Sequence, residues 1–546
     1  MAHGSRPRAE SREHHSPKPS EPKAQSPAPS PNGPPLDNQT KQKKMPLTRR
    51  DLLARSAFGA LPLLGLPNTD SEPQPPRAAR PPRTRDYVIE ASSALVYRNG
   101  APQLVENASV RVRDSEIVEV REGRIPGTLA RINATGQLLL PGLISGHTHA
   151  ASGSPTRGLI EGGRSYQRPI ELLEALPDDL LDDITAYNVA ELLRSGCTTH
   201  VEMSLSLKQA QSYVRVARRW HVRGFPGGMV PGTARLFPIW RRTSDTVLTD
   251  SVPDTMAEID ANRAFALSVN GAEDGLIRPM MTPHATDTHT PDTMRAVIAA
   301  ARALGNGIHT HLAQGAAEAR VTQRLYQLTP AQWLESLGAF DGPFFGAHMT
   351  GATAADWDVM KRHGGVYAHC PSGGGAGNSS GSQPYPEALA AGVRTNVGID
   401  THSNDYIENL KLAVICGRAR ARLLNGATVS RLPLPSVQQA VYGATHVAAD
   451  GLRRPDLGRI AVGAKADLCT IDVSGLLVGS GAVGPEPLNN LLYASGLAVR
   501  HVITQGYVQL FDGRFVVDDE ARIAQRGANA VRQIWAQLTS EGWFRG

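Results

Sequence analysis

The sequence predicts an α/β fold: a (β/α)8 TIM-type barrel with a small β-sandwich domain formed by N- and C-terminal strands. Two observations lead to this prediction. Short apolar runs alternate with helical stretches through the middle of the chain, as in parallel strands joined by helical crossovers. On both sides of that region apolar and polar residues alternate one by one, which is typical of half-buried strands.

The residues before the fold form two segments. Residues 1–44 are rich in Pro, Ser, Lys and Glu and almost lack large apolar side chains, so we expect a disordered, basic tail. Residues 45–84 contain Arg49-Arg50-Asp51-Leu52-Leu53 and an apolar stretch over 56–66, which resembles a twin-arginine export signal followed by a linker. The signal-like segment leads us to expect an exported protein, periplasmic or extracellular, without stable membrane association after signal removal. The alternative is that this segment is the start of an ordinary helix.

The positive charge of the chain lies in its first residues. Residues 1–50 carry ten Lys/Arg and four Asp/Glu, which accounts for the whole formal net charge of +6. The folded part is therefore about neutral, and no nucleic-acid partner is expected. The four cysteines are far apart and form no C-x-x-C pair, so neither a disulfide framework nor a cysteine zinc site is predicted.

The two parts of the sandwich are expected over residues 85–139 and 451–520. Their strands are predicted at residues 87–90, 108–113 and 116–120, and again at 499–504, 507–510 and 514–517. A C-terminal helix of roughly residues 518–538 is expected to close the chain, and the last segment, residues 521–546, is assigned to it.

The barrel is expected over residues 140–450. Its first strand is predicted in the run 137–144, which has no polar interruption after Gln137, as expected of a strand buried on both faces. Seven further runs bring the number of strands to the eight of a closed barrel; they cover residues 198–203, 224–230, 276–281, 307–311, 344–348, 366–369 and 393–398. Helices are expected over residues 182–195, 291–304, 329–337 and 353–363.

Two histidines directly follow the first barrel strand, in the run Gly146-His147-Thr148-His149. Side chains at i and i+2 of an extended segment point the same way, so both imidazoles can reach one ion. They lie at the carboxyl end of the strand, the face on which barrel enzymes carry their active sites. The pattern therefore predicts a metal site.

The run Leu140-Pro141-Gly142-Leu143-Ile144-Ser145-Gly146-His147-Thr148-His149 resembles the first-strand signature of the amidohydrolase superfamily. More narrowly, the chain resembles the branch that holds cytosine, guanine and adenosine-type deaminases and triazine (atrazine) hydrolases. The likeness extends from about residue 86 to about residue 538, and the later motifs follow in the family's order: Pro283-His284-Ala285, His309-Thr310-His311, Gly346-Ala347-His348, His369-Cys370-Pro371, Gly398-Ile399-Asp400 and Gly463-Ala464-Lys465-Ala466-Asp467-Leu468.

The resemblance implies a role for each of these residues. The metal ligands would be His147, His149, His311 and Asp400, with His309 the alternative to His311 within its motif. Asp400 would also act as general base, and His348 would polarise water or substrate. His284 would contact the substrate. Three imidazoles and one carboxylate suit one divalent ion, Zn²⁺ or Fe²⁺, and leave a position for water, whose pKa the ion lowers from about 15.7 towards about 7.

One ion is expected rather than two. Relatives with two metals often bridge them with a carboxylated lysine on the fourth strand. This chain has no lysine between Lys208 and Lys361, so no such bridge can form there.

Gln314 departs from the family pattern. Deaminases of this branch carry Glu three residues after the fifth-strand histidine, where it shuttles a proton. An amide such as Gln314 can orient a substrate but cannot cycle a proton near neutral pH. This disfavours ordinary nucleobase deamination and favours another leaving group, or an amide-like or carbamate-like C–N bond; His309, His402 and Glu202 are other possible proton donors. Arg157 and Glu161, in the long loop after the first strand, are candidate substrate contacts.

Three functions are considered. The first is a mononuclear, metal-dependent hydrolase of a small, cyclic, nitrogen-containing substrate. The second is an exported amide or peptide-type hydrolase with the same ligands, acting on a cyclic amide, an N-acyl amino acid or a dipeptide. The third is an inactive relative kept as a binding protein, which the intact ligand set argues against. The resemblance also implies a homodimer or a higher homo-oligomer.

Overall fold

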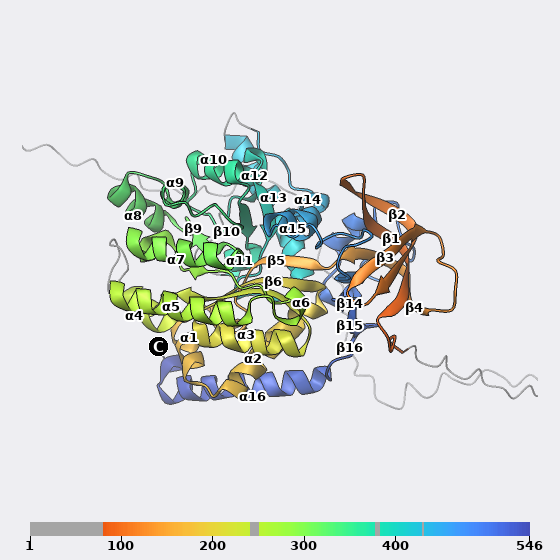
Figure 1. The fold of residues 1–546 in the computed structure, drawn as a ribbon, viewed down its shortest axis with the longest axis horizontal. Coiled ribbons are helices and arrows are strands. Elements are labelled where there is room, and N and C mark those ends of the chain that lie inside the picture. Colours follow the sequence, from red (N-terminus) through yellow and green to blue (C-terminus); the bar gives the residue numbers. More distant parts are fainter. Residues whose placement is uncertain (1–79, 241–250, 377–382, 428–430, 546) are drawn as a thin grey trace, which may run out of the picture. The chain divides into compact units, whose positions relative to one another are not determined.

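The computed structural model describes residues 80–240, 251–376, 383–427 and 431–545 (Figure 1). The expected basic tail and nearly all of the expected export signal and linker lie outside the described residues. None of the helices in the described ranges is long and apolar enough to cross a membrane.

Strands from both ends of the described chain lie together in one sheet (Figure 1). Their order is β16-β15-β14-β13-β4-β1-β2-β3. The two contributions meet where β4 pairs antiparallel with β13, with Pro141 opposite Leu468. The strands are β1 (Asp86–Arg98), β2 (Ala101–Arg113), β3 (Glu116–Glu122), β4 (Ala130–Pro141), β13 (Leu468–Asp472), β14 (Val499–Thr504), β15 (Tyr507–Phe511) and β16 (Arg514–Phe515).

The sheet curls around its own core. The Ile117 amide of β3 donates to the Ala464 carbonyl (2.8 Å), and the Gly463 amide donates to the Ile117 carbonyl (2.8 Å), so the β3 edge meets the segment before β13. Buried side chains from both ends of the chain, among them Tyr87, Ile132 and Ile503, pack inside. The predicted sandwich of N- and C-terminal strands is therefore confirmed.

Eight parallel strands form the barrel. They pair as two runs, β5-β6-β7-β8 and β9-β10-β11-β12. Bridges between Met281 and Ile308 and between Thr148 and Asp400 join the two runs at both seams, which closes the predicted barrel. The strands are β5 (Leu143–Thr148), β6 (Cys197–Ser204), β7 (Arg223–Val230), β8 (Thr282–Pro283), β9 (Ile308–Leu312), β10 (Phe344–His348), β11 (Val366–His369) and β12 (Arg394–Val397).

The prediction for the first barrel strand was wrong in its bounds. The apolar run 137–144 is divided between β4 of the sheet and β5 of the barrel. The chain passes from one to the other at Gly142, where a Cβ would lie 2.1 Å from Thr198 Oγ1. Because both segments are buried, no polar residue marks the boundary.

The fourth barrel strand is shorter than predicted and begins later. Residues 276–281 contribute only isolated bridges, at Ile277 and Met281, and β8 itself has two residues. Pro279 and Pro283 have no amide hydrogen, so regular pairing cannot extend through this segment.

The four predicted barrel helices are confirmed as α2, α7, α9 and α10. Helix α7 shows the local reasons: Thr290 caps its first turn, Pro291 opens it, and Gly305 ends it with φ 75°.

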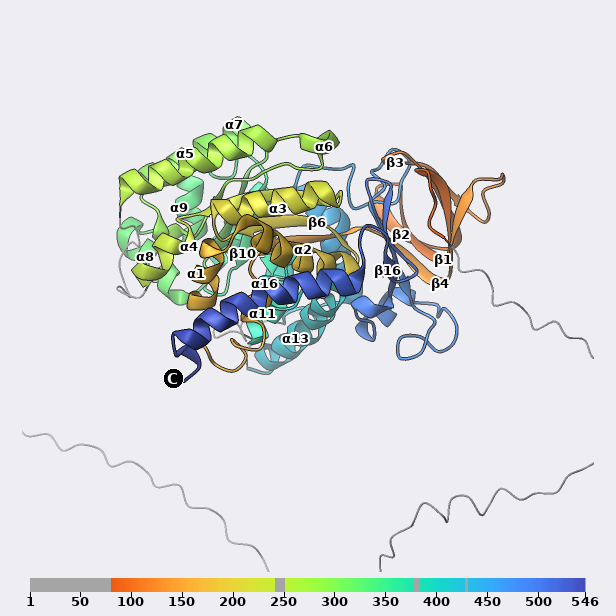
Figure 2. The ribbon, with the colours of Figure 1, turned by 90° about the horizontal axis from the view of Figure 1, so that it is seen from below.

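The C-terminal helix α16 lies against α2 (Figure 2). The helices are α1 (Gln167–Ala175), α2 (Asp178–Arg194), α3 (Leu207–Arg219), α4 (Thr233–Trp240), α5 (Val252–Val269), α6 (Ala272–Gly275), α7 (Pro291–Leu304), α8 (Ala316–Tyr326), α9 (Pro330–Ser336), α10 (Ala354–His363), α11 (Pro371–Ala376), α12 (Tyr385–Ala391), α13 (Tyr406–Ala427), α14 (Val437–Tyr442), α15 (Ala448–Gly451) and α16 (Glu520–Ser540).

Candidate active site

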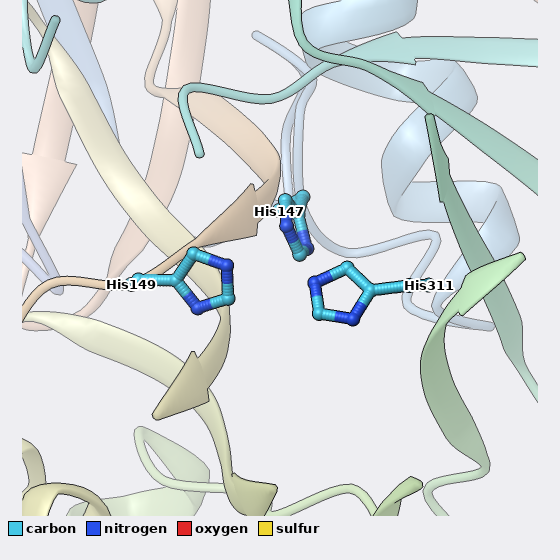
Figure 3. Close-up of side chains that lie close together, drawn as sticks. All are labelled: His147, His149 and His311. Atoms are coloured by element: carbon cyan, nitrogen blue, oxygen red, sulfur yellow. The ribbon is translucent and has the colours of Figure 1, made fainter. Parts of the chain in front are cut away.

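Three histidines converge at the carboxyl ends of the barrel strands. His147 and His149 come from the end of β5, and His311 comes from β9 on the opposite run of strands. One ring nitrogen from each lies within 4.8 Å of the others. Figure 3 shows the three rings directed at a common point. All three side chains are buried, and burial holds each of their pKa values below the ordinary range, so the imidazoles are neutral near pH 7.

In each ring, the contact that Nδ1 makes determines whether Nε2 is the nitrogen that faces the common point. His149 Nδ1 meets the Met203 carbonyl, and His311 Nδ1 meets the His284 carbonyl at 2.9 Å. A carbonyl accepts only from a protonated nitrogen, so Nε2 is the unprotonated atom in both neutral rings. His147 Nδ1 contacts His309 Nε2 at 2.8 Å.

His311 rather than His309 thus belongs to the converging group. His309 instead contacts the Nδ1 atom of His147. The Nε2 of His147 is buried and has no hydrogen-bond partner among the described residues.

Asp400 completes the group. One of its oxygens lies within 4.8 Å of ring nitrogens of His147 and His348, and Oδ1 is 3.4 Å from His149 Nε2. The residue sits just after β12 with φ 59°, a strained conformation for a residue with a side chain. Burial raises the pKa of Asp400, but the neighbouring imidazoles of His348, His149 and His402 outweigh this and hold it below the ordinary value, so the carboxyl is ionised near pH 7.

His348, at the end of β10, is oriented by a residue that the sequence did not indicate. Gln383 Oε1 accepts from the Cys370 amide at 2.7 Å, which fixes the orientation of this side-chain amide. Its Nε2 therefore donates to His348 Nδ1, at 3.3 Å. Burial lowers the pKa of His348, so the ring is neutral and carries its proton on Nε2; one of its ring nitrogens lies within 4.8 Å of ligand atoms of Asp400 and His147.

The donor set fits a divalent metal. Three imidazole Nε2 atoms and one carboxylate are the ligands of mononuclear Zn²⁺ or Fe²⁺ sites, and the orphaned, buried Nε2 of His147 would gain its missing partner from an ion. On the fourth strand, β8 and the residue after it are Thr282, Pro283 and His284, so no lysine is available there to bridge a second ion.

A cavity of about 490 Å³ opens onto the ligands. His149, His311 and Asp400 line it, together with the predicted substrate contacts His284 and Gln314. Burial lowers the pKa of His284 to about 3, so its ring is neutral.

The loop that carries Gln314 is held by a buried carboxyl on α8. Glu318 accepts from the Gln314 amide at 2.7 Å and from the Thr286 amide at 3.2 Å. Burial, with Asp287 nearby, raises the pKa of Glu318 to about 8. This residue therefore ties the loop after β9, which carries Gln314, to the loop after β8.

Arg157, a candidate substrate contact, does not line the cavity at the ligands. Its guanidinium forms a double hydrogen bond with Glu191, at 2.7 and 2.8 Å, and lines a second cavity of about 540 Å³, which shares His402 with the first. Glu161 lines that second cavity too. Sequence position alone could not reveal the partner on α2 that holds Arg157 there.

The three alternative proton donors lie in different places. Glu202 accepts from Thr148 Oγ1 at 2.6 Å and from the Ala150 amide, which fixes the end of β5, and burial raises its pKa to about 7. His309 lies behind His147. Of the three, only His402 is among the described residues that line the cavity at the ligands.

Residues 138–508 match the family model described as the amidohydrolase family. The chain belongs to the amidohydrolase family. It is a metal-dependent hydrolase that acts on carbon–nitrogen bonds other than peptide bonds, as the sequence predicted.

Curated relatives cover most of this amidohydrolase. It is 30% identical to a 5-methylthioadenosine/S-adenosylhomocysteine deaminase of Pelotomaculum thermopropionicum over 393 residues, which is 69% of this chain and 81% of the relative. It is 24% identical to a 5'-deoxyadenosine deaminase of Methanosarcina mazei, over 83% of this chain and 100% of the relative.

Two solved structures share the fold. An atrazine chlorohydrolase from Arthrobacter aurescens complexed with zinc has 20% identity and a TM-score of 0.68, over 82% of this chain and 100% of the other. An adenosine deaminase from Xanthomonas campestris with bound zinc has 24% identity and a TM-score of 0.67, over 84% of this chain and 100% of the other.

Proposed function

We propose that this amidohydrolase holds one divalent ion, Zn²⁺ or Fe²⁺, between His147, His149, His311 and Asp400, and hydrolyses a small nitrogen heterocycle at a ring carbon that carries an exocyclic leaving group. The observation that supports this most strongly is the convergence of these ligand atoms at the floor of the cavity. The adenosine-type deaminases and triazine hydrolases among its relatives support a heterocyclic substrate.

When bound, the ion supplies Lewis acidity and lowers the pKa of a water molecule from about 15.7 towards about 7. The ionised carboxylate of Asp400, next to His149, accepts the proton that the attacking water loses. The Nε2 proton of His348, which Gln383 holds in place, is donated to the oxygen on which negative charge develops. His284 and Gln314 line the cavity beside the ligands and hydrogen-bond the substrate ring.

The leaving group depends on Gln314. Its amide can hold a ring nitrogen or a substituent in place, but it cannot deliver a proton. We therefore propose that the leaving group either departs without being protonated by a carboxylic acid at position 314, or is protonated by His402, which also lines the cavity. The second candidate, an amide or dipeptide hydrolase, has the same ligands but no relative above that supports it.

A screen of aminated, halogenated and alkoxylated purines, pyrimidines and triazines tests this function. Ammonia is measured together with the mass of each product, for the wild type, for Gln314→Glu and for Gln327→Glu as a control at an α8 terminus away from the ligands. We expect hydrolysis of a heterocycle by the wild type, and ammonia release that rises selectively in Gln314→Glu.

Two outcomes would count against the proposal. Strong ammonia release by the wild type, with none gained in Gln314→Glu, would refute the role of Gln314. Cleavage of N-acyl amino acids or dipeptides, with every heterocycle unchanged, would replace the proposed function by the second candidate.

Export is a separate proposal, based on Arg49 and Arg50 and the apolar stretch that follows them. The double variant Arg49→Lys/Arg50→Lys keeps the charge and removes the arginine pair. We expect it to stay in the cytoplasm while the wild type reaches the periplasm or medium, as measured by cell fractionation. Equal export of both proteins would contradict the twin-arginine route.

A further inference from the structure

Residues 147–150, here called the ligand segment, leave the regular ladder between β5 and β6. Ser145 pairs with His200, but Thr148 pairs with Glu202, so β5 holds one residue more than β6 in this stretch. Such a β-bulge redirects side chains and is common beside active sites. The ligand segment is therefore not held by a regular ladder on its β6 side.

On its other side the ligand segment is bound to the loop after β12. The His147 carbonyl accepts from the amides of Ile399 and Asp400, at 2.9 and 3.2 Å. The His149 amide donates to the Asp400 carbonyl at 3.3 Å. These bonds connect the main chains of three proposed metal ligands, but they fix the segment from one side alone.

Glu202, near the end of β6, supplies the contacts on the β6 side. Its side chain is fully buried. The carboxylate accepts from the Thr148 hydroxyl at 2.6 Å and from the Ala150 amide at 3.0 and 3.1 Å. Ser204 Oγ donates to the same carboxylate at 2.8 Å, which anchors it to its own strand. One side chain therefore binds the residues directly before and after His149.

The end of β6 also sets the ring of His149. Met203, the residue after Glu202, offers its carbonyl to His149 Nδ1, which leaves Nε2 for an ion. Two consecutive residues of β6 thus hold the main chain and the ring of one ligand. Groups that orient a ligand in this way raise metal affinity, because the ligand is already in place when the ion arrives.

We infer that Glu202 is a positioning residue for the metal site: its carboxylate holds the ligand segment so that His147 and His149 are in place before an ion binds. The inference rests on the metal ion of the proposed function. It gives Glu202 a role in holding ligands rather than in moving a proton, because its side chain is buried and is not among the described residues that line the cavity at the ligands.

Two substitutions at this position test the role through zinc affinity, measured by chelator competition on the full chain. Glu202→Leu removes both acceptor oxygens, and we expect zinc affinity to fall about 10- to 100-fold, the usual effect of losing a group that orients a ligand. Glu202→Gln keeps one oxygen for Thr148 and Ala150. We expect it to retain most of the affinity, since positioning needs the hydrogen bonds and not the charge.

Asp356→Leu is the matched control for the loss of a buried carboxylate. Asp356 is also fully buried, and it accepts from the Ala331 amide at 2.9 Å and from the amide and hydroxyl of Thr353 at 2.8 and 2.9 Å. None of these three residues lines the cavity at the ligands. We expect this variant to lose thermal stability as Glu202→Leu does, but to keep the zinc affinity of the wild type.

Two single-hydroxyl variants keep the inference testable if Glu202→Leu does not fold. Thr148→Val and Ser204→Ala each remove one donor to Glu202, but only Thr148 belongs to the ligand segment. We expect the larger loss of zinc affinity in Thr148→Val. The visible spectrum of the Co²⁺-loaded protein, which reports the geometry of the ligands, should change in Thr148→Val and stay as in the wild type in Asp356→Leu.

Unchanged zinc affinity in both Glu202→Leu and Thr148→Val would overturn the inference. Equal losses in Glu202→Leu and Glu202→Gln would also overturn it, because the charge and not the hydrogen bonds would then act on the ion. Equal losses in Glu202→Leu and Asp356→Leu would show a general effect of stability, with the same consequence. A wild type that binds no zinc would reject the proposed function together with the inference, whereas the other outcomes leave the proposed function standing.

Discussion

At the scale of single residues, the site depends on contacts that set which nitrogen each histidine presents. Carbonyls of Met203 and His284 set His149 and His311, and Gln383 sets His348. A metal ligand must offer a lone pair, whereas a group that stabilises an anion must offer a proton. Because these partners differ, His149 and His311 offer a lone pair to the metal, whereas His348 offers a proton to the anion.

The role of Gln383 leads to a prediction about turnover. Gln383→Glu keeps an acceptor for the Cys370 amide but replaces the donor to His348 Nδ1 by an acceptor, so the proton moves away from Nε2. We expect kcat on the substrate found in the screen to fall about 10²-fold, the typical effect of losing one donor to a developing anion, with a small change in KM. Steady-state kinetics and a thermal melt measure this. A wild-type kcat in a folded Gln383→Glu protein would show that His348 does not act through this tautomer.

The sequence placed His147, His149, His311, His348 and Asp400 correctly in one cluster, because each lies in or just after the carboxyl end of a barrel strand and strand ends meet on one face. It did not indicate Gln383 or Glu318. Each of them acts through a partner far away along the chain, His348 for Gln383 and Thr286 for Glu318, and no local spacing records such a contact. For the same reason the sequence did not indicate Glu191, the partner of Arg157 on α2.

At the scale of elements, the C-terminal helix α16 supports the loop after β5 that borders the cavity. Trp535 Nε1 donates to the Pro155 carbonyl at 3.1 Å, and Arg164 donates to carbonyls just beyond the helix. The sequence predicted this helix, but not the surface on which it packs. The bounds differ from the prediction in the uninterrupted apolar run 137–144 and in the proline-broken fourth strand, and also in the sheet, where β1 and β2 extend beyond the predicted 87–90 and 108–113.

The contacts beyond α16 lead to a second prediction. Deletion of residues 541–546 removes the carbonyls that hold Arg164 and leaves the helix itself. We expect KM to rise about 5- to 30-fold, which corresponds to roughly 1–2 kcal/mol for two hydrogen bonds, with kcat little changed. Glu541→Gln, which removes only the ion pair with Arg168, is the control and should raise KM less. An unchanged KM in the deletion would mean that the loop does not need this support.

At the scale of the whole described fold, one buried ion pair joins barrel and sheet. Arg223, at the start of β7, donates to Asp467 just before β13, at 2.6 and 3.3 Å. Both side chains are almost fully buried, at 1% and 4% exposure. Asp467 belongs to the Gly463–Leu468 motif that the sequence analysis noted, and this contact gives the motif a structural reason.

Removing one partner of this pair should destabilise the fold. Asp467→Ala leaves a buried guanidinium without its counter-charge, so we expect the free energy of unfolding to fall by about 3–5 kcal/mol. Glu122→Ala, which removes an exposed ion pair with Arg98 in the same sheet, should cost no more than about 1 kcal/mol. Denaturant unfolding of both variants measures the difference. Equal, small losses would show that the pair does not hold barrel and sheet together.

The central claim, one metal ion at the ends of β5, β9 and β12, is tested most directly by elemental analysis of the purified full chain. We predict about one Zn or Fe per chain in the wild type, loss of most of it in His147→Ala, and retention in His363→Ala, whose histidine instead pairs with Glu335. About two ions per chain, or an unchanged metal content in His147→Ala, would contradict the account.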